Sequence, residues 1–482
     1  MILNSVKRIF LVLCMFVLIS SITACSQNKE NEGSEKRSSE MKLVSVKDIN
    51  SDTQIIDIRD EEYFIGWKNG NGISGHIENA VDFPISWIKN DANKEKIDTE
   101  LNRRKISKDK KTILYSDDTI SGEDYAKYQA LGFKDLYVLE GGISAYSKEN
   151  GKLAKLEGYQ MYVSPRWVEE LIADKKPEGY NGEKYKIVEV SLPSEKDEYA
   201  NGHIKGAINF NSDEINHIPG PRTIQEYEGI SMDKQLKFWG FPDDKDIKSY
   251  LESKGIDSNT MVILYATEKA TTAANRAALV MDYAGVKNIK LINGGKPLWI
   301  LENRGLDKTI EKSDKVDFGV DVPQNPKIVI KSDEERRLVD DKNAVIASVR
   351  SFDEYLGKMS GYTYIEKAGD IKNSRFAYAG SNPYAMEDYR NLDNTMFNYE
   401  LCKERWNKWG IKEEKMVSFH CGTGWRASET YYIAKALGWK NIGVYVGGWY
   451  EWSKLPNAPV KPEGLPTDAP EKQPEEYFYD KE

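Results

Sequence analysis

Three stretches of this chain repeat one pattern at a constant interval, and this triplication limits the fold more than any other feature. The stretches are ALGFKDLYVLEGGISAY, YAGVKNIKLINGGKPLW and ALGWKNIGVYVGGWYEW. Their first glycines are Gly132, Gly285 and Gly438, and both intervals, 285 − 132 and 438 − 285, are 153 residues. This period is far longer than that of a solenoid repeat, so each copy is expected to be a whole domain.

The repeat divides the mature chain into three units. We place unit one at residues 43–157, unit two at 158–312 and unit three at 313–460. A tail at 461–482, rich in Pro and Glu, is predicted to be extended. Hydrophobic residues make up 40% of the chain and aromatic residues 11%, which is enough for three packed cores.

Within each unit, short apolar strands alternate with amphipathic helices. The clearest strands are Thr112–Tyr115, Met261–Tyr265 and Met416–Phe419. This alternation predicts an α/β fold in which a parallel sheet carries helices on both faces. In such sheets a ligand site lies at the carboxyl ends of the strands.

A glycine-rich turn follows the last of these strands and carries a thiol. The turn begins at Cys421, and a helix is predicted from Arg426 to Leu437. A strand–turn–helix junction points backbone N–H groups and the positive end of the helix dipole at one place. A thiol there is shifted toward thiolate, and an anion beside it is stabilised. The alternative is an inert buried cysteine, but such a residue does not need two glycines and an arginine around it.

This turn resembles the active-site loop of the rhodanese (sulfurtransferase) family, which reads Cys-x-x-Gly-x-Arg followed by a small residue and Ser or Thr. The residues that fill the pattern are Cys421, Gly424, Arg426, Ala427 and Ser428. The resemblance implies three tandem rhodanese-like domains of an exported bacterial type. It also implies that Cys421 takes a sulfane sulfur from a donor, carries it as a persulfide and passes it to cyanide or a thiol. No metal and no organic cofactor are implied.

The residues after Cys421 are expected to bind the sulfur donor: Gly422, Thr423, Gly424, Trp425 and Arg426. In the family, basic loop residues accompany thiosulfate and small uncharged ones accompany 3-mercaptopyruvate. The expected donor is thiosulfate or a related compound, with 3-mercaptopyruvate as the alternative. Arg426 is expected either to neutralise the donor or to brace the loop carbonyls. Trp425 and Trp449 are expected to be either pocket walls or core residues.

Two other classes of function are alternatives to a sulfurtransferase. Cell-cycle phosphatases share the rhodanese fold, but their loop places five residues between Cys and Arg, whereas Cys421 and Arg426 are separated by four. The shorter loop suits a single sulfur better than a phosphate. A non-enzymatic surface-binding protein is the other alternative, and the intact loop of unit three argues against it.

Units one and two lack the thiol. Asp117 and Thr267 fall at the position of Cys421, so both units are expected to be non-catalytic and to act by packing against unit three. His76 and His203 recur in a Gly-His-Ile motif and are expected to hydrogen-bond a turn. An insertion at residues 211–245 is expected either to cover the site of unit three or to brace the interface between units.

The first residues predict export. Residues 1–24 combine a basic start with an apolar run, Ile9 to Ile19, that is too short to span a bilayer. Ile22–Cys25 resembles the lipobox of bacterial lipoproteins, so Cys25 is expected to be lipidated and to anchor the protein on the extracytoplasmic face of the cell membrane. Residues 25–42 are predicted to be a polar tether.

Charge and cysteine content narrow the partners. The net charge is −9 and no basic cluster follows the signal, which argues against nucleic acid as a partner. The folded part contains two cysteines, so no disulfide framework is expected. Cys402 lies in a helical pattern and is expected either to be packed or to resolve the persulfide as a disulfide.

Overall fold

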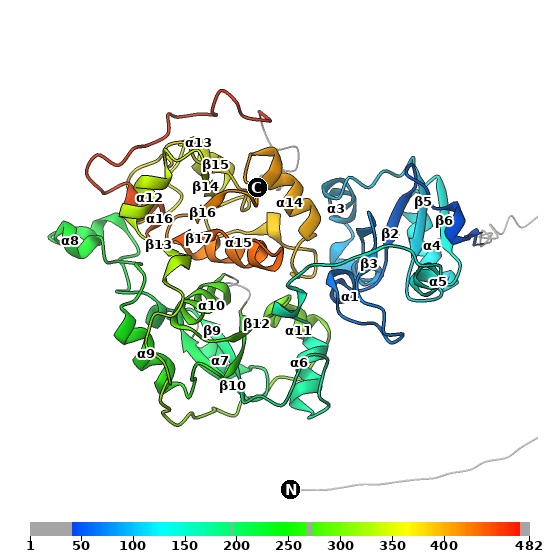
Figure 1. The fold of residues 1–482 in the computed structure, drawn as a ribbon, viewed down its shortest axis with the longest axis horizontal. Coiled ribbons are helices and arrows are strands. Elements are labelled where there is room, and N and C mark those ends of the chain that lie inside the picture. The colour runs from blue at the N-terminus through cyan, green and yellow to red at the C-terminus, as the bar shows by residue number, and fades with distance from the viewer. Residues whose placement is uncertain (1–40, 194–195, 268–271, 473–482) are drawn as a thin grey trace, which may run out of the picture. The chain divides into compact units, whose positions relative to one another are not determined.

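A computed structural model describes residues 41–472 apart from the gaps at 194–195 and 268–271. The predicted signal, Cys25 and residues 473–482 lie outside the described residues. Each of the three units contains a five-stranded sheet. Figure 1 shows helices around these sheets.

The three sheets have the same strand order. Unit one contains β1 (Leu43–Val44), β6 (Asp135–Leu139), β5 (Lys111–Tyr115), β2 (Gln54–Asp57) and β4 (Val81–Asp82). Unit two contains β8 (Tyr162–Val163), β12 (Asn288–Ile292), β11 (Met261–Ala266), β9 (Tyr185–Ser191) and β10 (Ala207–Asn211). Unit three contains β13 (Val329–Ile330), β17 (Ile442–Tyr445), β16 (Met416–His420), β14 (Ala344–Ser348) and β15 (Arg375–Phe376). Numbered along each unit, every order is 1-5-4-2-3, and all neighbours are parallel. The predicted fold of three α/β domains with parallel sheets is therefore confirmed.

The helices are divided among the three units. Unit one has α1 (Glu61–Ile65), α2 (Ile85–Lys89), α3 (Ile97–Arg103), α4 (Gly122–Ala130) and α5 (Gly142–Lys148). Unit two has α6 (Pro165–Ile172), α7 (Lys196–Asn201), α8 (Met232–Gln235), α9 (Asp244–Ser253), α10 (Ala273–Ala284) and α11 (Gly295–Leu301). Unit three has α12 (Ser332–Leu338), α13 (Phe352–Leu356), α14 (Tyr399–Lys408), α15 (Trp425–Ala436) and α16 (Gly448–Trp452).

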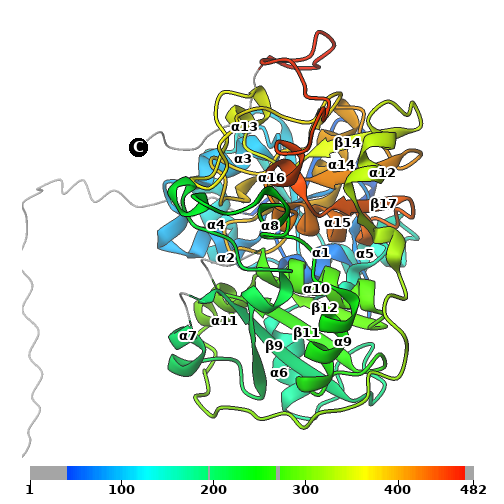
Figure 2. The ribbon, with the colours of Figure 1, turned by 90° about the vertical axis from the view of Figure 1, so that its left-hand side faces the viewer.

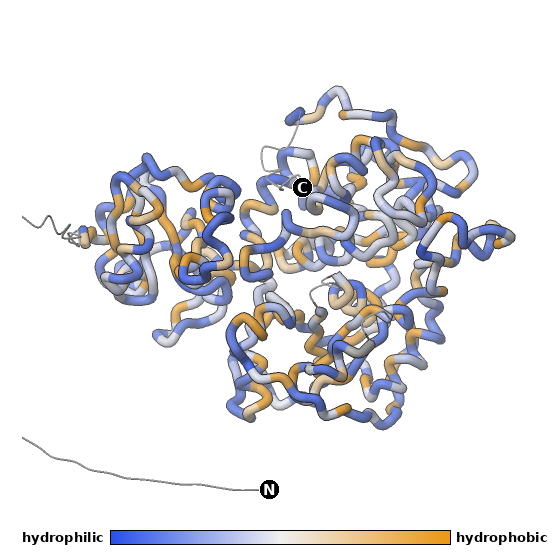
Figure 3. The backbone as a smooth tube through the Cα atoms, turned by 180° about the vertical axis from the view of Figure 1, so that it is seen from behind, coloured by the Kyte–Doolittle hydropathy of each residue, from blue (hydrophilic) through white to orange (hydrophobic). Residues whose placement is uncertain are grey.

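The central strands are buried along their length. All residues of β11 are buried, and all of β16 except its first residue. Strands of a parallel sheet covered on both faces read as apolar runs rather than as alternating patterns, which explains why these strands were visible in the sequence. Figure 3 shows hydrophobic stretches alternating with hydrophilic ones along the backbone.

The helices α10 and α15 pack against each other where units two and three meet, as Figures 1 and 2 show. All residues of α10 are buried, and so are ten of the twelve residues of α15. A helix buried all round has no solvent face, so its polar residues must find partners in the protein. Residues of unit two therefore lie close to the start of α15, where the predicted active-site turn is located.

Smaller elements complete the fold. An antiparallel pair, β3 (His76–Ile77) and β7 (Leu153–Ala154), lies beside the first sheet. Among the described residues, none of the helices has the length and hydrophobicity that crossing a bilayer requires.

Candidate active site

Cys421 lies at the junction that the sequence predicted. Strand β16 ends at His420 and helix α15 begins at Trp425. Gly424 is the N-cap of α15 and has a φ of 79°, a left-handed conformation that favours glycine. The Cys421 side chain is 0% exposed, so the thiol is enclosed in the conformation described.

The carbonyl groups of this turn are held by the next helix. The N–H of Trp449 donates to the Cys421 carbonyl at 2.8 Å, and the N–H of Tyr450 donates to the Gly422 carbonyl at 2.9 Å. Gly448 allows this approach, because a Cβ there would lie 2.5 Å from the Gly422 oxygen. The carbonyls of the turn are thus bonded to α16, while the first N–H groups of α15 have no acceptor within the helix and are suited to bind an anion.

Arg426 is paired with a carboxylate. Its Nη1 and Nη2 each donate to Glu354 at 3.0 Å, and Glu354 also accepts from Arg350 Nε at 3.1 Å. Burial alone would raise the pKa of Glu354, but the two guanidinium groups outweigh it and hold the pKa to about 2. Of the two roles expected for Arg426, the structure favours bracing, although through a carboxylate rather than through the loop carbonyls.

The other predicted donor-binding residues occupy different environments. Thr423 is buried, Trp425 is half-buried, and the Trp425 Nε1 donates to Asn216 Oδ1 of unit two at 3.3 Å. A Cβ on Gly422 would lie 2.2 Å from the Tyr362 ring, so only glycine fits beneath that ring. Trp449 is buried and donates to the carbonyl of Lys367, which makes it a core residue rather than a pocket wall.

Aromatic residues cover the turn on the side of Gly422. The Tyr362 ring stacks on Tyr364, with centroids 5.0 Å apart, and meets Tyr384 edge-on at 5.1 Å. Trp239 of unit two lies 5.3 Å from Tyr364. Tyr384 is 69% exposed, so this cluster runs from the buried turn to the solvent.

The insertion at residues 211–245 takes part in this cover. The carbonyl of Arg222 accepts from Thr363 Oγ1 at 2.7 Å, and the hydroxyls of Tyr227 and Tyr450 lie 3.0 Å apart. Together with Trp239, these contacts show that the insertion packs on the segments around the turn. Both expected roles are therefore combined, because the insertion covers the turn and also joins units two and three.

His420, directly before the thiol, faces a second carboxylate. Its Nε2 lies 3.2 Å from Asp370 Oδ1, and Ser348 Oγ donates to Asp370 Oδ2 at 2.7 Å. Burial opposes the charge of Asp370, but His420 and Arg350 hold its pKa to about 2. Asp370 takes the place of the motif histidines of units one and two, so the third copy exchanged that histidine for an ion-pair network.

Cys402 and the histidines of the Gly-His-Ile motif have structural rather than catalytic roles. Burial raises the pKa of the Cys402 thiol to about 12, which keeps it protonated and unreactive and argues against a resolving role. The Nδ1 atoms of His76 and His203 lie 2.7 Å from the carbonyls of Phe64 and Tyr199. Both histidines therefore hydrogen-bond the backbone, but their partners are carbonyls of the helices α1 and α7, whereas a turn was expected.

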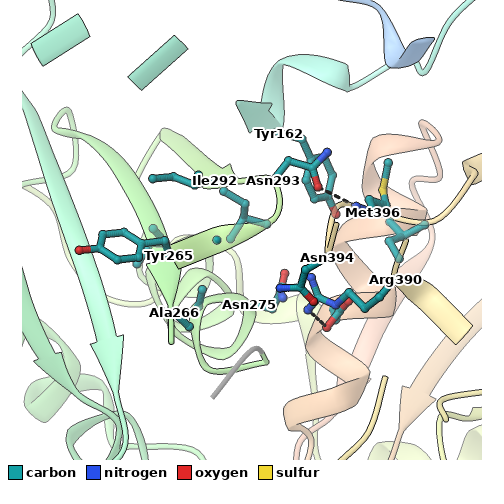
Figure 4. A pocket seen from close by; sticks show the side chains of 15 residues that line it. Tyr162, Tyr265, Ala266, Asn275, Ile292, Asn293, Arg390, Asn394 and Met396 are labelled. Carbon is teal, nitrogen blue, oxygen red and sulfur yellow. Dashed lines mark hydrogen bonds and ion pairs between the residues drawn. The ribbon is translucent and has the colours of Figure 1, made fainter. Parts of the chain in front are cut away.

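The equivalent positions in units one and two carry no thiol. Asp117 accepts from Asn69 at 2.6 Å and pairs with Arg59 at 3.3 Å. In unit two, a small cavity of about 40 Å³ lies beyond β11. This volume has room for only a few water molecules. In Figure 4, Asn275 lies near Arg390 of unit three, whereas Asn293 accepts a hydrogen bond from the N–H of Met396. Among the described residues, no group of His, Cys, Asp and Glu side chains is suited to hold a metal ion.

Comparison with known proteins adds to this geometry. The family described as rhodanese-like domain matches three times, at residues 44–149, 164–302 and 332–455. A thiosulfate sulfurtransferase of Escherichia coli, YnjE, is 34% identical over 410 residues, which cover 84% of this chain and 88% of the relative. The sulfur carrier protein TtuD of Thermus thermophilus is 25% identical over 252 residues, 51% of this chain and 85% of the relative.

Solved structures show the same arrangement of domains. The wild-type structure of EanB has a TM-score of 0.80 and 28% identity, and covers 89% of this chain and 100% of its own. In another EanB structure, with a TM-score of 0.79, ergothioneine is covalently linked with a persulfide cysteine. A third, with the same TM-score, is the anaerobic ergothioneine biosynthesis enzyme of Chlorobium limicola in complex with its natural substrate, trimethyl histidine.

Proposed function

Because this chain belongs to the rhodanese family and is a sulfurtransferase that works through a cysteine persulfide, we propose that Cys421 is its nucleophile and carries the sulfur. The observation that supports this most strongly is the position of Cys421 at the start of α15, in a turn whose carbonyls are bonded by α16. We infer thiosulfate, or a related sulfane donor, as the source of the sulfur.

The reaction has two steps. The Cys421 thiolate attacks the outer sulfur of thiosulfate, a new S–S bond forms, and the S–S bond of the donor breaks so that its electron pair leaves with sulfite. The resulting persulfide anion is stabilised by the N–H groups and the dipole at the start of α15. A thiolate or cyanide then attacks the outer persulfide sulfur, and Cys421 returns as thiolate.

The composition of the turn makes 3-mercaptopyruvate the alternative donor to test. Gly422 and Thr423 bring no charge to the turn, and the charge of Arg426 is neutralised by Glu354. These features suit 3-mercaptopyruvate, whereas the name of the Escherichia coli relative favours thiosulfate. Steady-state turnover with both donors, measured side by side, decides between them. A higher kcat/KM with 3-mercaptopyruvate would refute the thiosulfate assignment.

The nucleophile is tested by a pair of serine variants. Cys421→Ser should abolish the formation of thiocyanate from thiosulfate and cyanide, whereas Cys402→Ser should retain most of it. Turnover by the Cys421 variant would disprove the assignment. The bidentate pair between Arg426 and Glu354 also argues against a phosphatase, since that arginine is not available to a phosphate. The protein should therefore not hydrolyse aryl phosphates.

A second candidate function concerns the sulfur acceptor. EanB variants with a replaced tyrosine or a replaced threonine have been solved in complex with ergothioneine or hercynine. In EanB, that tyrosine precedes the persulfide cysteine and that threonine follows it. In this chain, Tyr362 and Thr423 have the same spacings from Cys421. Tyr362 also belongs to the aromatic cluster over the turn, and aromatic faces bind quaternary ammonium groups.

This candidate predicts sulfur transfer to a trimethylated histidine. Enzyme preloaded with sulfane sulfur is incubated with hercynine or with histidine, which lacks the quaternary ammonium. A sulfur-containing product that forms from hercynine but not from histidine supports this candidate function. Discharge to cyanide without any product from hercynine rules it out.

The location of the protein is proposed from its sequence. Export and lipid anchoring at Cys25, on the extracytoplasmic face of the cell membrane, are supported by the short apolar run and by the lipobox-like Ile22–Cys25. A single acyl chain binds a membrane only marginally, so stable anchoring requires more than one.

A further inference from the structure

A buried arginine of unit two lies at the turn of unit three without a carboxylate partner. Arg276 is on α10 and is 0% exposed. Four other buried arginines are paired with Asp or Glu: Arg59, Arg104, Arg350 and Arg426. A fifth, Arg405, donates to the backbone carbonyl of Asp388 at 3.0 Å. In the part of the chain that the structure describes, no acid pairs with Arg276.

The Arg276 side chain extends to the active-site turn. A Cβ built on Gly424 would lie 3.3 Å from Arg276 Nη1. That same nitrogen, like Nε, has no hydrogen-bond partner among the described residues, while Nη2 makes only a long bond of 3.5 Å to the carbonyl of Gly240. The ring of Phe241 lies 5.0 Å from the guanidinium on another side. One of the two unsatisfied nitrogens, Nη1, therefore lies at the turn.

An unpaired buried guanidinium is costly unless an anion compensates it. Burial lowers the pKa of Arg276 to about 10, against the opposing effect of the Cys421 thiolate. The side chain consequently remains charged at neutral pH. The other charged groups at the turn already have partners. Arg426 and Arg350 share Glu354, and Arg350 also lies 3.5 Å from Asp370, which faces His420.

We propose that Arg276 forms an oxyanion subsite beside Cys421, which binds the anionic end of the sulfur donor and the oxyanion that leaves it. This inference rests on the proposed function, to which it adds the residue that binds the sulfur donor. While Cys421 takes the outer sulfur, the electron pair of the breaking S–S bond goes to the sulfite, and the Arg276 guanidinium holds those oxygens. Unit two, which has no thiol of its own, thus contributes a binding residue to the site of unit three.

This proposal explains how a donor dianion is bound by a turn without free positive side chains. Arg426 is occupied, and the residues between it and Cys421 are uncharged. Guanidinium groups bind oxyanions through charge-assisted N–H bonds, and Arg276 has unused donors on Nη1 and Nε, of which Nη1 is the one placed at the turn.

The test compares Arg276→Gln, Arg276→Lys and the control Arg337→Gln, whose exposed arginine lies on α12. With thiosulfate, Arg276→Gln should raise KM about 10-fold or more and weaken product inhibition by sulfite by a similar factor, as loss of a charge-assisted contact predicts. Arg276→Lys should recover part of both effects, because it restores the charge. The control should behave as wild type, and circular dichroism should show all variants folded.

A second measurement separates this proposal from the assignment of the reaction. Binding of sulfate to the sulfur-free protein, followed by calorimetry, requires no turnover. The wild type and the control should bind sulfate, and Arg276→Gln should bind it about 10-fold or more weakly. Equal sulfate affinity in all proteins would overturn the proposed oxyanion subsite. An unchanged KM and unchanged sulfite inhibition in Arg276→Gln would do the same, even if sulfur transfer by Cys421 is established.

Discussion

Replacing Glu354 by glutamine removes the one negative charge that holds Arg426 and Arg350 together. The change keeps the size of the side chain but leaves two buried guanidinium groups without their shared anion. The pKa of Glu354 falls from an ordinary 4.5 to about 2. At about 1.4 kcal/mol for each pKa unit, this difference corresponds to roughly 3 kcal/mol of stability at neutral pH. Loss of one partner of a buried ion pair typically costs about 3–5 kcal/mol, which agrees.

The pH dependence of this loss provides a sharper test. Because the pKa of Glu354 is lowered by folding, its contribution is fully present above pH 4.5 and is lost as the pH falls toward 2. The difference in stability between wild type and Glu354→Gln should therefore be largest at neutral pH and should narrow below about pH 4.5.

The assay is urea unfolding followed by tryptophan fluorescence at several pH values. The matched control is Asp353→Asn on the same helix, whose partner Lys358 is exposed, and it should cost no more than about 1 kcal/mol. Glu354→Gln should also lower sulfur transfer, because Arg426 no longer braces the turn. Wild-type stability of Glu354→Gln at pH 7, or a difference that does not change with pH, would refute the reasoning.

Three further predictions follow from single contacts. Gly448→Ala should reduce sulfur transfer about 10-fold or more, since its Cβ would collide with the carbonyl of Gly422; Gly410→Ala, which also has a positive φ but open space around it, should retain activity in the same thiocyanate assay. Cys402→Ser should lower the midpoint of thermal unfolding without changing kcat/KM, because a polar hydroxyl replaces a fully buried thiol. Cys25→Ala should move the protein from the detergent phase to the aqueous phase in a phase-partition experiment, with sulfur transfer unchanged; a variant that stays in the detergent phase would contradict lipid anchoring.

The sequence predicted those parts of the fold and site that depend on local patterns. The glycine pairs at a 153-residue interval gave three domains, and the apolar runs gave the central strands. The turn at Cys421 was visible because its glycines and the start of α15 are adjacent along the chain. The motif also indicated a hydrogen-bonding role for His76, but not its partner, the Phe64 carbonyl of α1.

Contacts between distant segments were not predictable from one sequence. Ser351 and Glu354 form a capping box that the spacing could have revealed, but nothing local indicates that Glu354 bridges two arginines. Arg276 lies in unit two, which lacks the thiol, so only the packing of α10 on α15 brings it to the turn. The location of Trp449 could not be predicted for the same reason, because a tryptophan after a glycine pair can line a pocket or pack in a core.

The central claim, that Cys421 carries the sulfur, is tested most directly by the mass of the protein after loading. Wild-type protein is incubated with thiosulfate, freed of small molecules and measured intact, and its peptides are then mapped. The expected result is the added mass of one sulfur atom on the peptide that contains Cys421, removed by cyanide and absent from Cys421→Ser. Added sulfur on the peptide containing Cys402 instead, or an unchanged mass of the wild type with each candidate donor, would contradict the account.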